Sequence, residues 1–197
     1  MSDLKLFNTL AKKKQSFTPR KKGNVKLFTC GPSVYRKQHL GNYRTYLFED
    51  LLHRYLSYSG LSVDRVINFT DIEDKAIAEA REKGVSVAEL RRPVEIDYLR
   101  ECKLLDILLP DTIPRATTSV DSAVHLIQRL IDRGHAYWHK GEVFYDPLTY
   151  KGFGRLYGLD MKHWPRKKIR FRKDTYPGQR WNRGDFILWH KREEKEG

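Results

Sequence analysis

The sequence predicts an α/β protein, in which a parallel sheet with crossover helices is followed by a small β-rich part. Strand-like and helix-like patterns alternate over residues 25–84, which is the order of a βαβ unit. After residue 134 the helical pattern gives way to alternating aromatic and polar residues with glycines. We therefore place one domain at residues 1–134 and a second, insertion-like subdomain at residues 135–197.

The first strand and helix are expected between residues 25 and 59. VKLFTC (25–30) is a short apolar run that ends at a glycine turn, so it predicts a buried strand. Apolar side chains then recur at helical spacing from Tyr43 to Ser59, and Gly60 provides the stop. Asn42 directly precedes this pattern and is expected to cap the helix.

The second strand and helix follow without a long connection. LSVDRVINFT (61–70) is rich in β-branched residues and predicts a strand. Thr70 and Glu73 have the spacing of a capping box, which would begin a helix that runs through Lys83 and ends at Gly84. Two strands joined through a helix predict a parallel pair.

A longer helix is expected next. Ser86 and Glu89 offer another capping box, and Pro93 predicts a kinked or split helix that ends near Leu109. Cys102 falls on the apolar face of this segment, and core burial is the preferred interpretation for it.

The last regular elements are a helix and a hairpin. PRATTSVDSAVHLIQRLIDRG (114–134) carries apolar residues on one helical face and ends in a glycine stop. HAYWHKGEVFYDP (135–147) alternates around Lys140-Gly141, which is typical of a β-hairpin.

The charge of the chain is strongly positive, at +13. From residue 4 to residue 48 there are eleven Lys or Arg and no Asp or Glu, and the run 161–183 holds nine basic residues against Asp174. Clustered charge of one sign favours a nucleic-acid partner, although a solvated basic face is the simpler alternative.

Several classes of protein are disfavoured. No apolar run approaches the roughly 20 residues of a membrane span, and the first residues lack the apolar core of a signal peptide. Cys30 and Cys102 are the only cysteines, which is too few for a disulfide framework. We therefore expect a cytoplasmic protein without a membrane partner.

The sequence His39-Leu40-Gly41-Asn42 stands where a ligand site is expected. Ligands of open α/β sheets bind beyond the carboxyl ends of strands, at helix N-termini. Gly41 would let a ligand approach the backbone, and the backbone N–H groups there favour a phosphate. A histidine could donate hydrogen bonds to phosphate oxygens. A turn with a capping Asn and an incidental surface His is the alternative.

Six ordered blocks carry a resemblance to a known family. The chain resembles the class I aminoacyl-tRNA synthetases, and specifically cysteinyl-tRNA synthetase, in the blocks LKLFNTL, CGPSVYRKQHLGNYRTYLFEDLLHRYL, VINFTDIEDKAI, PRATTSV, GHAYWHKGEVFYD and DFILWHKR. The resemblance covers essentially the entire chain. It implies an incomplete Rossmann-like sheet with part of the insertion near the tRNA acceptor end, and an enzyme that activates cysteine with ATP and transfers it to tRNA-Cys.

The resemblance assigns roles to the helix start. His39, Gly41 and Asn42 match the ATP-binding signature His-Ile-Gly-His, with Asn in its last position, as is seen in this family. It implies that these three residues contact ATP phosphates and that His39 and Asn42 act in catalysis.

The resemblance also implies a zinc ion that grips the thiolate of the substrate. Cys30 matches the first of four ligands, and zinc prefers soft sulfur to the hydroxyl of serine or threonine. The other three ligands, a Lys-Met-Ser-Lys-Ser loop and an anticodon-binding domain would lie beyond Gly197, so we expect zinc binding to be poor.

Five further residues belong to the expected ATP- and substrate-binding set. Gly31 and Pro32 lie in the Cys-Gly-Pro block, and Tyr35 would line the cysteine pocket or simply pack. Thr70 and Asp71 match the end of the family's Asn-Ile-Thr-Asp element and would border the active-site cleft, unless they only cap a helix.

Three descriptions of the chain therefore stay open. It is the N-terminal half of a cysteine–tRNA ligase, inactive by itself, and its partners are cysteine, ATP and tRNA-Cys. Alternatively it is a non-catalytic, truncated relative that binds RNA, or one half of a split synthetase whose C-terminal half is a separate chain.

Overall fold

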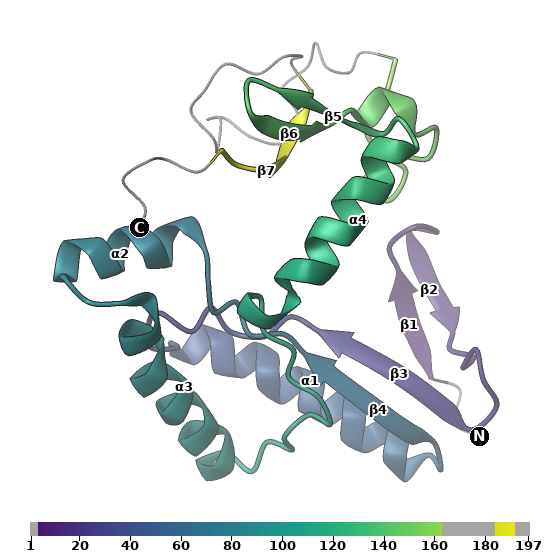
Figure 1. Ribbon diagram of the computed structural model, residues 1–197. Coiled ribbons are helices and arrows are strands. Elements are labelled where there is room, and N and C mark those ends of the chain that lie inside the picture. The colour runs from purple at the N-terminus through teal and green to yellow at the C-terminus, as the bar shows by residue number, and fades with distance from the viewer. Residues whose placement is uncertain (1–3, 163–183, 192–197) are drawn as a thin grey trace. The chain divides into compact units, whose positions relative to one another are not determined.

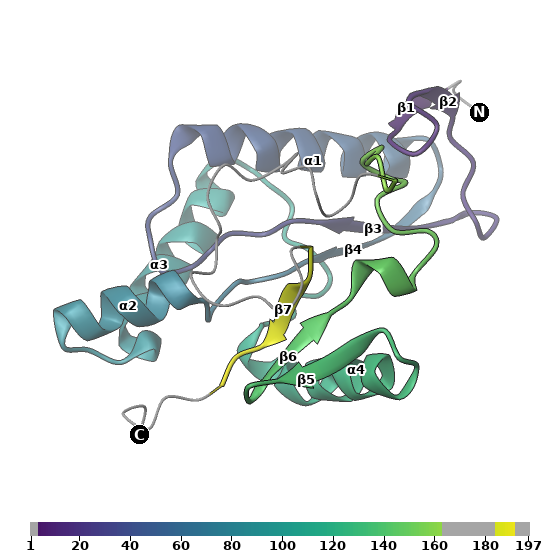
Figure 2. The ribbon, with the colours of Figure 1, turned by 90° about the horizontal axis from the view of Figure 1, so that it is seen from above.

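The computed structural model describes residues 4–162 and 184–191 (Figures 1 and 2). The chain divides into two compact units. The first unit comprises residues 1–4 and 16–120, and the second comprises residues 5–15 and 121–197. The domain boundary expected after residue 134 stays a prediction. Most of the basic run 161–183 lies outside the described residues.

The first unit is built on a parallel pair of strands. β3 (Asn24–Thr29) and β4 (Ser62–Ile67) pair in register along their whole length, and α1 (Leu40–Tyr58) connects them. Figure 2 shows α1 running alongside the two strands. The βαβ unit predicted from residues 25–70 is confirmed.

Two helices follow β4, namely α2 (Asp74–Lys83) and α3 (Val87–Leu104). Gly84 ends α2 with a φ of +65°, a left-handed conformation that glycine adopts without strain, as predicted. The capping box predicted for Thr70 and Glu73 is wrong. Glu73 is the N-cap residue without a side-chain cap, because the Thr70 backbone pairs instead with Pro32 and Val34 in the segment after β3.

The start of α3 was predicted correctly, but its course was not. The backbone N–H of Ser86 donates to Glu89 Oε2 at 2.8 Å, and Glu89 N–H donates to Ser86 Oγ at 3.2 Å. Pro93 lies inside a helix that continues to Leu104, so the expected split and the end near Leu109 are wrong. Burial of Val94, Tyr98 and Cys102 along one face outweighs the hydrogen bond lost at Pro93.

The core of the first unit lies between α1, α3 and the strand ends. Tyr98 is its centre, with ring centroids 5.4 Å from Tyr46 and 5.5 Å from Phe69, both edge to face. Cys102 is 1% exposed, which confirms the predicted core role. The buried members of this cluster are Val34, Tyr43, Tyr46, Ile67, Phe69, Val94, Tyr98, Cys102 and Ile107.

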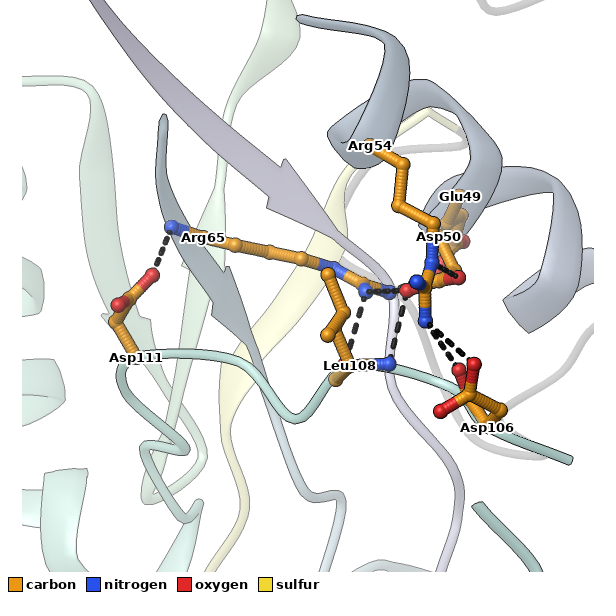
Figure 3. A network of polar contacts seen from close by, with 7 residues as sticks. All are labelled: Glu49, Asp50, Arg54, Arg65, Asp106, Leu108 and Asp111. Carbon is orange, nitrogen blue, oxygen red and sulfur yellow. Dashed lines mark hydrogen bonds and ion pairs between the residues drawn. The ribbon is translucent and has the colours of Figure 1, made fainter. Parts of the chain in front are cut away.

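A buried ion network ties β4 to α1 (Figure 3). The Arg65 side chain is 2% exposed, and its Nη2 lies 3.3 Å from Glu49 Oε2 and its Nη1 3.9 Å from Asp50 Oδ1. Asp50 in turn accepts hydrogen bonds from Leu108 N–H at 2.9 Å and from Arg54 Nε at 2.6 Å. The network fixes the turn after α3 against α1.

In the part of the second unit that the structure describes, two small sheets accompany one α-helix. β1 (Lys5–Asn8) and β2 (Lys13–Ser16) form a two-stranded sheet that the sequence patterns did not predict. α4 (Val120–Asp132) follows a 3₁₀ turn at Thr117–Ser119, so the helix begins later than the predicted residue 114. None of the α4 side chains is buried.

The larger sheet of the second unit is antiparallel. It consists of β5 (Ala136–His139), β6 (Glu142–Tyr145) and β7 (Phe186–Trp189) in that order. Lys140 and Gly141 connect β5 to β6 with φ values of +50° and +85°, so the predicted hairpin is confirmed. A short 3₁₀ helix, Pro147–Thr149, follows β6.

Among the described residues, no helix is both long enough and apolar enough to cross a membrane.

Candidate active site at the carboxyl ends of β3 and β4

The chain segments that leave β3 and β4 are hydrogen-bonded and closely packed at Gly31. The Gly31 N–H donates to Asn68 Oδ1 at 3.2 Å. A Cβ atom at position 31 would lie 1.9 Å from the backbone oxygen of Asn68, which is far inside van der Waals contact. Only glycine lets the two segments approach this closely, so Gly31 is required by the local packing.

A second set of contacts continues this junction. Thr70 N–H donates to the Pro32 carbonyl at 3.1 Å, and Val34 N–H donates to the Thr70 carbonyl at 3.2 Å. The Thr70 hydroxyl accepts a hydrogen bond from the Asn68 side-chain amide at 3.3 Å. Gly31, Pro32 and Thr70 therefore lie together, and their backbone extends the parallel pairing beyond the strands.

Asp71 is buried behind this junction. Its carboxylate accepts hydrogen bonds from the backbone N–H of Thr117 at 2.9 Å, from the Thr117 hydroxyl and from Arg91. Burial raises the pKa of this carboxyl, but the Thr117 hydrogen bonds and the Arg91 charge outweigh burial, so the pKa lies below its usual value. The Asp71 side chain thus holds the segment after Arg115 against the end of β4.

The N-terminus of α1 carries the predicted phosphate-binding residues. His39 is the N-cap residue and is exposed, with extended backbone. Asn42 occupies the third helical position, and its Oδ1 accepts a hydrogen bond from His39 N–H at 3.1 Å. The predicted N-cap role of Asn42 is therefore wrong, because the helix begins at Leu40. Asn42 instead fixes the backbone of His39.

Gly41 leaves room for the imidazole of His39. A Cβ atom at position 41 would lie 3.0 Å from Cε1 and Nδ1 of that ring. The histidine ring therefore lies over the first turn of α1, where helix N–H groups favour an anion. An exposed imidazole at this place can donate a hydrogen bond to a phosphate oxygen.

The loop between β3 and α1 is held by residues that the site prediction did not include. Gln38 Nε2 donates to the Ser33 carbonyl at 3.2 Å, and the Tyr46 hydroxyl donates to Gln38 Oε1 at 3.0 Å. Asn68 has the same kind of role at the end of β4. Asn68 is the first residue of the Asn-Phe-Thr-Asp block, whose last two residues were predicted to border the site. Its place in this block is the signal that could have identified Asn68 as a site residue.

Tyr35 is half-buried in the same loop. The Arg36 guanidinium carbon lies 5.4 Å from the centroid of the Tyr35 ring. Burial and the nearby Glu73 carboxylate raise the pKa of the Tyr35 hydroxyl. The phenol therefore stays protonated and can donate a hydrogen bond at neutral pH.

Cys30 is exposed directly after β3, with its sulfur 3.7 Å from the Gly31 carbonyl. Within residues 4–162 and 184–191, no three His, Cys, Asp or Glu side chains are grouped to hold a metal. A tetrahedral zinc site requires four donors, so the described residues do not fit a complete zinc site.

The fold of the chain is similar to that of two solved tRNA synthetase structures. A Mycobacterium tuberculosis methionyl-tRNA synthetase in complex with methionyl-adenylate is similar over 58% of this chain and 23% of its own, with a TM-score of 0.53 and 21% identity. A ternary LeuRS–tRNA–LeuAMS complex from Agrobacterium radiobacter K84 is similar over 67% of this chain and 18% of its own, with a TM-score of 0.53 and 22% identity. At these identities the likeness shows the fold alone.

The sequence places the chain within one family of synthetases. Residues 16–197 match the family described as tRNA synthetases class I (C) catalytic domain, and the chain belongs to that family.

Curated relatives share this assignment. Cysteine–tRNA ligases from Lachnoclostridium phytofermentans, Pyrococcus horikoshii and Chlamydia muridarum are 36%, 37% and 40% identical over 94%, 95% and 95% of the chain. The chain spans 39% of the length of each of these three relatives.

Proposed function

We propose that this chain forms the ATP- and cysteine-binding part of a cysteine–tRNA ligase. One observation carries the proposal: the segments that leave β3 and β4 are hydrogen-bonded at Gly31 and Asn68, and the segment after β3 leads to an exposed His39 at the start of the 19-residue α1. This is the place where α/β sheets bind nucleotides. The cysteine–tRNA ligase relatives make cysteine the proposed amino acid.

In the proposed reaction, a carboxylate oxygen of cysteine attacks the α-phosphorus of ATP. The bond to the bridging oxygen of the β-phosphate breaks, so the products are cysteinyl-adenylate and pyrophosphate. Transfer of the cysteinyl group to a hydroxyl at the 3′ end of tRNA then releases AMP. The reaction relies on positioning and on stabilisation of the charge that develops on the phosphate oxygens.

We assign that stabilisation to the α1 N-terminus. His39 would donate a hydrogen bond to a phosphate oxygen, and the helix N–H groups near Gly41 would supply further positive potential. Asn42 would act as a positioning residue, because its amide oxygen holds the His39 backbone. Asp71 is buried and engaged by Thr117, so we assign it to holding the site together.

The cysteine side chain would lie near the end of β3. Cys30, Pro32 and Tyr35 belong to the segment that leaves this strand, and we propose that Cys30 and Tyr35 line the amino-acid pocket. Zinc bound by thiolate would favour a thiol substrate. Since the described residues offer a single exposed thiolate donor, no step is assigned to a metal here.

Apolar surfaces of the first unit support a role within a larger fold. α1 exposes a stripe of large apolar residues on one face, namely Leu40, Leu47, Phe48, Leu51, Tyr55 and Tyr58. Phe28 on β3 is 66% exposed on the sheet. Apolar side chains in such a row normally pack against protein. We propose that the rest of a class I catalytic domain covers them, either within the same polypeptide or as a separate one.

ATP binding by the chain tests this assignment. Equilibrium dialysis with radiolabelled ATP would compare the unaltered chain with His39→Ala and with His125→Ala, a matched change at an exposed histidine on α4. We expect His39→Ala to weaken binding about 10- to 150-fold, the contribution of one hydrogen bond to a charged group, and His125→Ala to have no effect. Equal affinities for all three proteins would contradict the proposal.

A further inference from the structure

The loop between β3 and α1 ends at Gln38, the residue directly before His39. The side chain of Gln38 reaches back along this loop, where its Nε2 donates to the Ser33 carbonyl at 3.2 Å and to the Arg36 carbonyl at 3.0 Å. Ser33 belongs to the junction with β4, because it forms a parallel bridge with Thr70. One side chain therefore links the strand junction to the start of α1.

The hydrogen bonds of Gln38 determine how its amide is oriented. Carbonyl oxygens accept hydrogen bonds but do not donate them, so the NH₂ group must face Ser33 and Arg36. The amide oxygen accepts from the Tyr46 hydroxyl on α1 at 3.0 Å. Burial raises the pKa of the Tyr46 hydroxyl, so this hydroxyl keeps its proton and remains a donor at neutral pH. The direction of the Gln38 side chain and the orientation of its amide are thus both specified.

Tyr46 is anchored in the core of the first unit. It is 5% exposed, and its ring packs edge to face against Tyr43 and Tyr98, with centroid distances of 5.7 Å and 5.4 Å. Close packing on two sides leaves the Tyr46 ring little freedom to move. Its hydroxyl is therefore a fixed point to which Gln38 attaches the loop.

Other side chains of the loop form ion pairs at the surface. Arg36 Nε lies 2.8 Å from Glu79 Oε2 on α2, and Lys37 Nζ lies 3.1 Å from Asp97 Oδ2 on α3. The Arg36 and Lys37 side chains are 71% and 77% exposed, and exposed ion pairs contribute little because water screens them. The half-buried amide of Gln38, bonded to a buried hydroxyl, is the stronger restraint on the loop.

His39 is restrained on both sides by these contacts. On the helix side, its N–H donates to Asn42 Oδ1 at 3.1 Å. On the loop side, Gln38 fixes the residue that precedes it. Because His39 is exposed, burial does not position it, and the place of its imidazole depends on these backbone restraints.

We propose that Gln38 and Tyr46 are positioning residues, which hold the imidazole of His39 where it can donate to a phosphate oxygen of ATP. They act through the loop backbone and not by contact with ATP. A donor that is held in place loses less conformational entropy on binding, so loosening the loop weakens ATP binding. The part played by ATP rests on the proposed function of His39, whereas the restraint on the loop does not.

Tyr46→Phe tests the proposal, because it removes the hydroxyl and keeps the buried ring. In equilibrium dialysis we expect the Kd for ATP to rise about 2- to 12-fold, the effect of losing one hydrogen bond. Tyr43→Phe is the matched control: it removes a hydroxyl from the same helix and the same aromatic cluster, but that hydroxyl donates to Glu101 on α3. The control should leave the Kd unchanged.

A double-mutant cycle with His39 distinguishes positioning from a general loss of stability. If Tyr46 acts through the imidazole, Tyr46→Phe should raise the Kd by less than about twofold in a chain that already carries His39→Ala. An equal rise with and without the imidazole would overturn the proposal.

Hydrogen exchange of residues 33–39, followed by mass spectrometry without ATP, tests the restraint by itself. This segment should exchange faster in Tyr46→Phe and show little change in Tyr43→Phe or in Asp97→Asn, which removes the charge that pairs with Lys37. Unchanged exchange in Tyr46→Phe would overturn the proposal even where His39→Ala weakens ATP binding as expected. An ATP affinity that His39→Ala leaves unchanged would instead contradict the proposed function, which the exchange measurement does not involve.

Discussion

Replacing Gly31 by alanine would test the junction between the ends of β3 and β4. The added Cβ atom would lie 1.9 Å from the backbone oxygen of Asn68 and 2.9 Å from its carbonyl carbon. Contacts of a Cβ atom below 3.0 Å are essentially never seen. Because both neighbours are backbone atoms, the two segments must separate by about an ångström or more, and the bond from Gly31 N–H to Asn68 Oδ1 is lost.

The expected cost follows from these two effects. Overpacking of a tight contact costs about 1–3 kcal/mol, and loss of one hydrogen bond costs about 0.5–1.5 kcal/mol. The free energy of unfolding should therefore fall by about 2–4 kcal/mol. For a chain of this size, that corresponds to a decrease in Tm of roughly 4–16 °C. ATP affinity should fall as well, since the site is built on the junction.

Gly41→Ala is the matched control for this experiment. Its Cβ atom would meet only the His39 ring, at 3.0 Å, and a side chain can rotate away. Alanine also favours the helix, so stability should change by less than about 1 kcal/mol while ATP affinity falls. Urea unfolding followed by circular dichroism measures both variants. If Gly31→Ala unfolds at the same urea concentration as the unaltered chain, the close approach at Asn68 is not a constraint.

Three further predictions concern stability and metal binding. Arg65→Met should lower the free energy of unfolding by about 3–5 kcal/mol, because Glu49 is left buried without its cation. Adding Glu49→Gln to this variant should restore part of the lost stability. A urea-unfolding double-mutant cycle in which the two effects are additive would contradict the pairing. Asp71 has a folded-state pKa below the unfolded value of about 3.9, so its stabilisation is present above about pH 4 and is lost as pH falls through the folded pKa. The Asp71→Asn variant should therefore be less stable than the unaltered chain at pH 7, and it should lose less stability between pH 5 and pH 3. If the free energy of unfolding of both proteins depends on pH in the same way, the prediction is contradicted. The 197-residue chain should bind zinc weakly, with little change in Cys30→Ala, and stoichiometric zinc by elemental analysis that this variant loses would show the prediction wrong.

Elements with strong local signals were predictable from the sequence. The hairpin at Lys140-Gly141 needs two positive φ values, and the glycine at position 84 provides the left-handed stop of α2. The parallel pair of β3 and β4 follows from the order of a strand, a helix and a strand. In each case the determining residues are adjacent in sequence, so pattern and structure agree.

The prediction failed where distant contacts compete with local ones. Thr70 has capping-box spacing with Glu73, but its backbone pairs with Pro32 and Val34 in the segment after β3. Pro93 has a helix-breaking effect that burial of Tyr98 and Cys102 outweighs. Such contacts depend on the folded arrangement and are not encoded in spacing alone.

The candidate site was predictable only in part. His39 and Gly41 were identified because a helix start after a strand is a local feature. The contact between Asp71 and Thr117 joins residues 46 positions apart, and the role of Asn68 depends on a glycine 37 positions away. Block resemblance located these residues near the site but could not show which of them hold it together.

Cysteine-dependent ATP–pyrophosphate exchange tests most directly whether the ends of β3 and β4, with His39, form a site of cysteine activation. A chimera would join this chain to the remaining part of the Pyrococcus horikoshii ligase, to which it is 37% identical. We predict exchange that requires cysteine and that falls about 100- to 1000-fold in His39→Ala, the usual cost of removing a donor to transition-state charge. A folded chimera whose exchange is absent, or is unaffected by His39→Ala, would contradict the assignment.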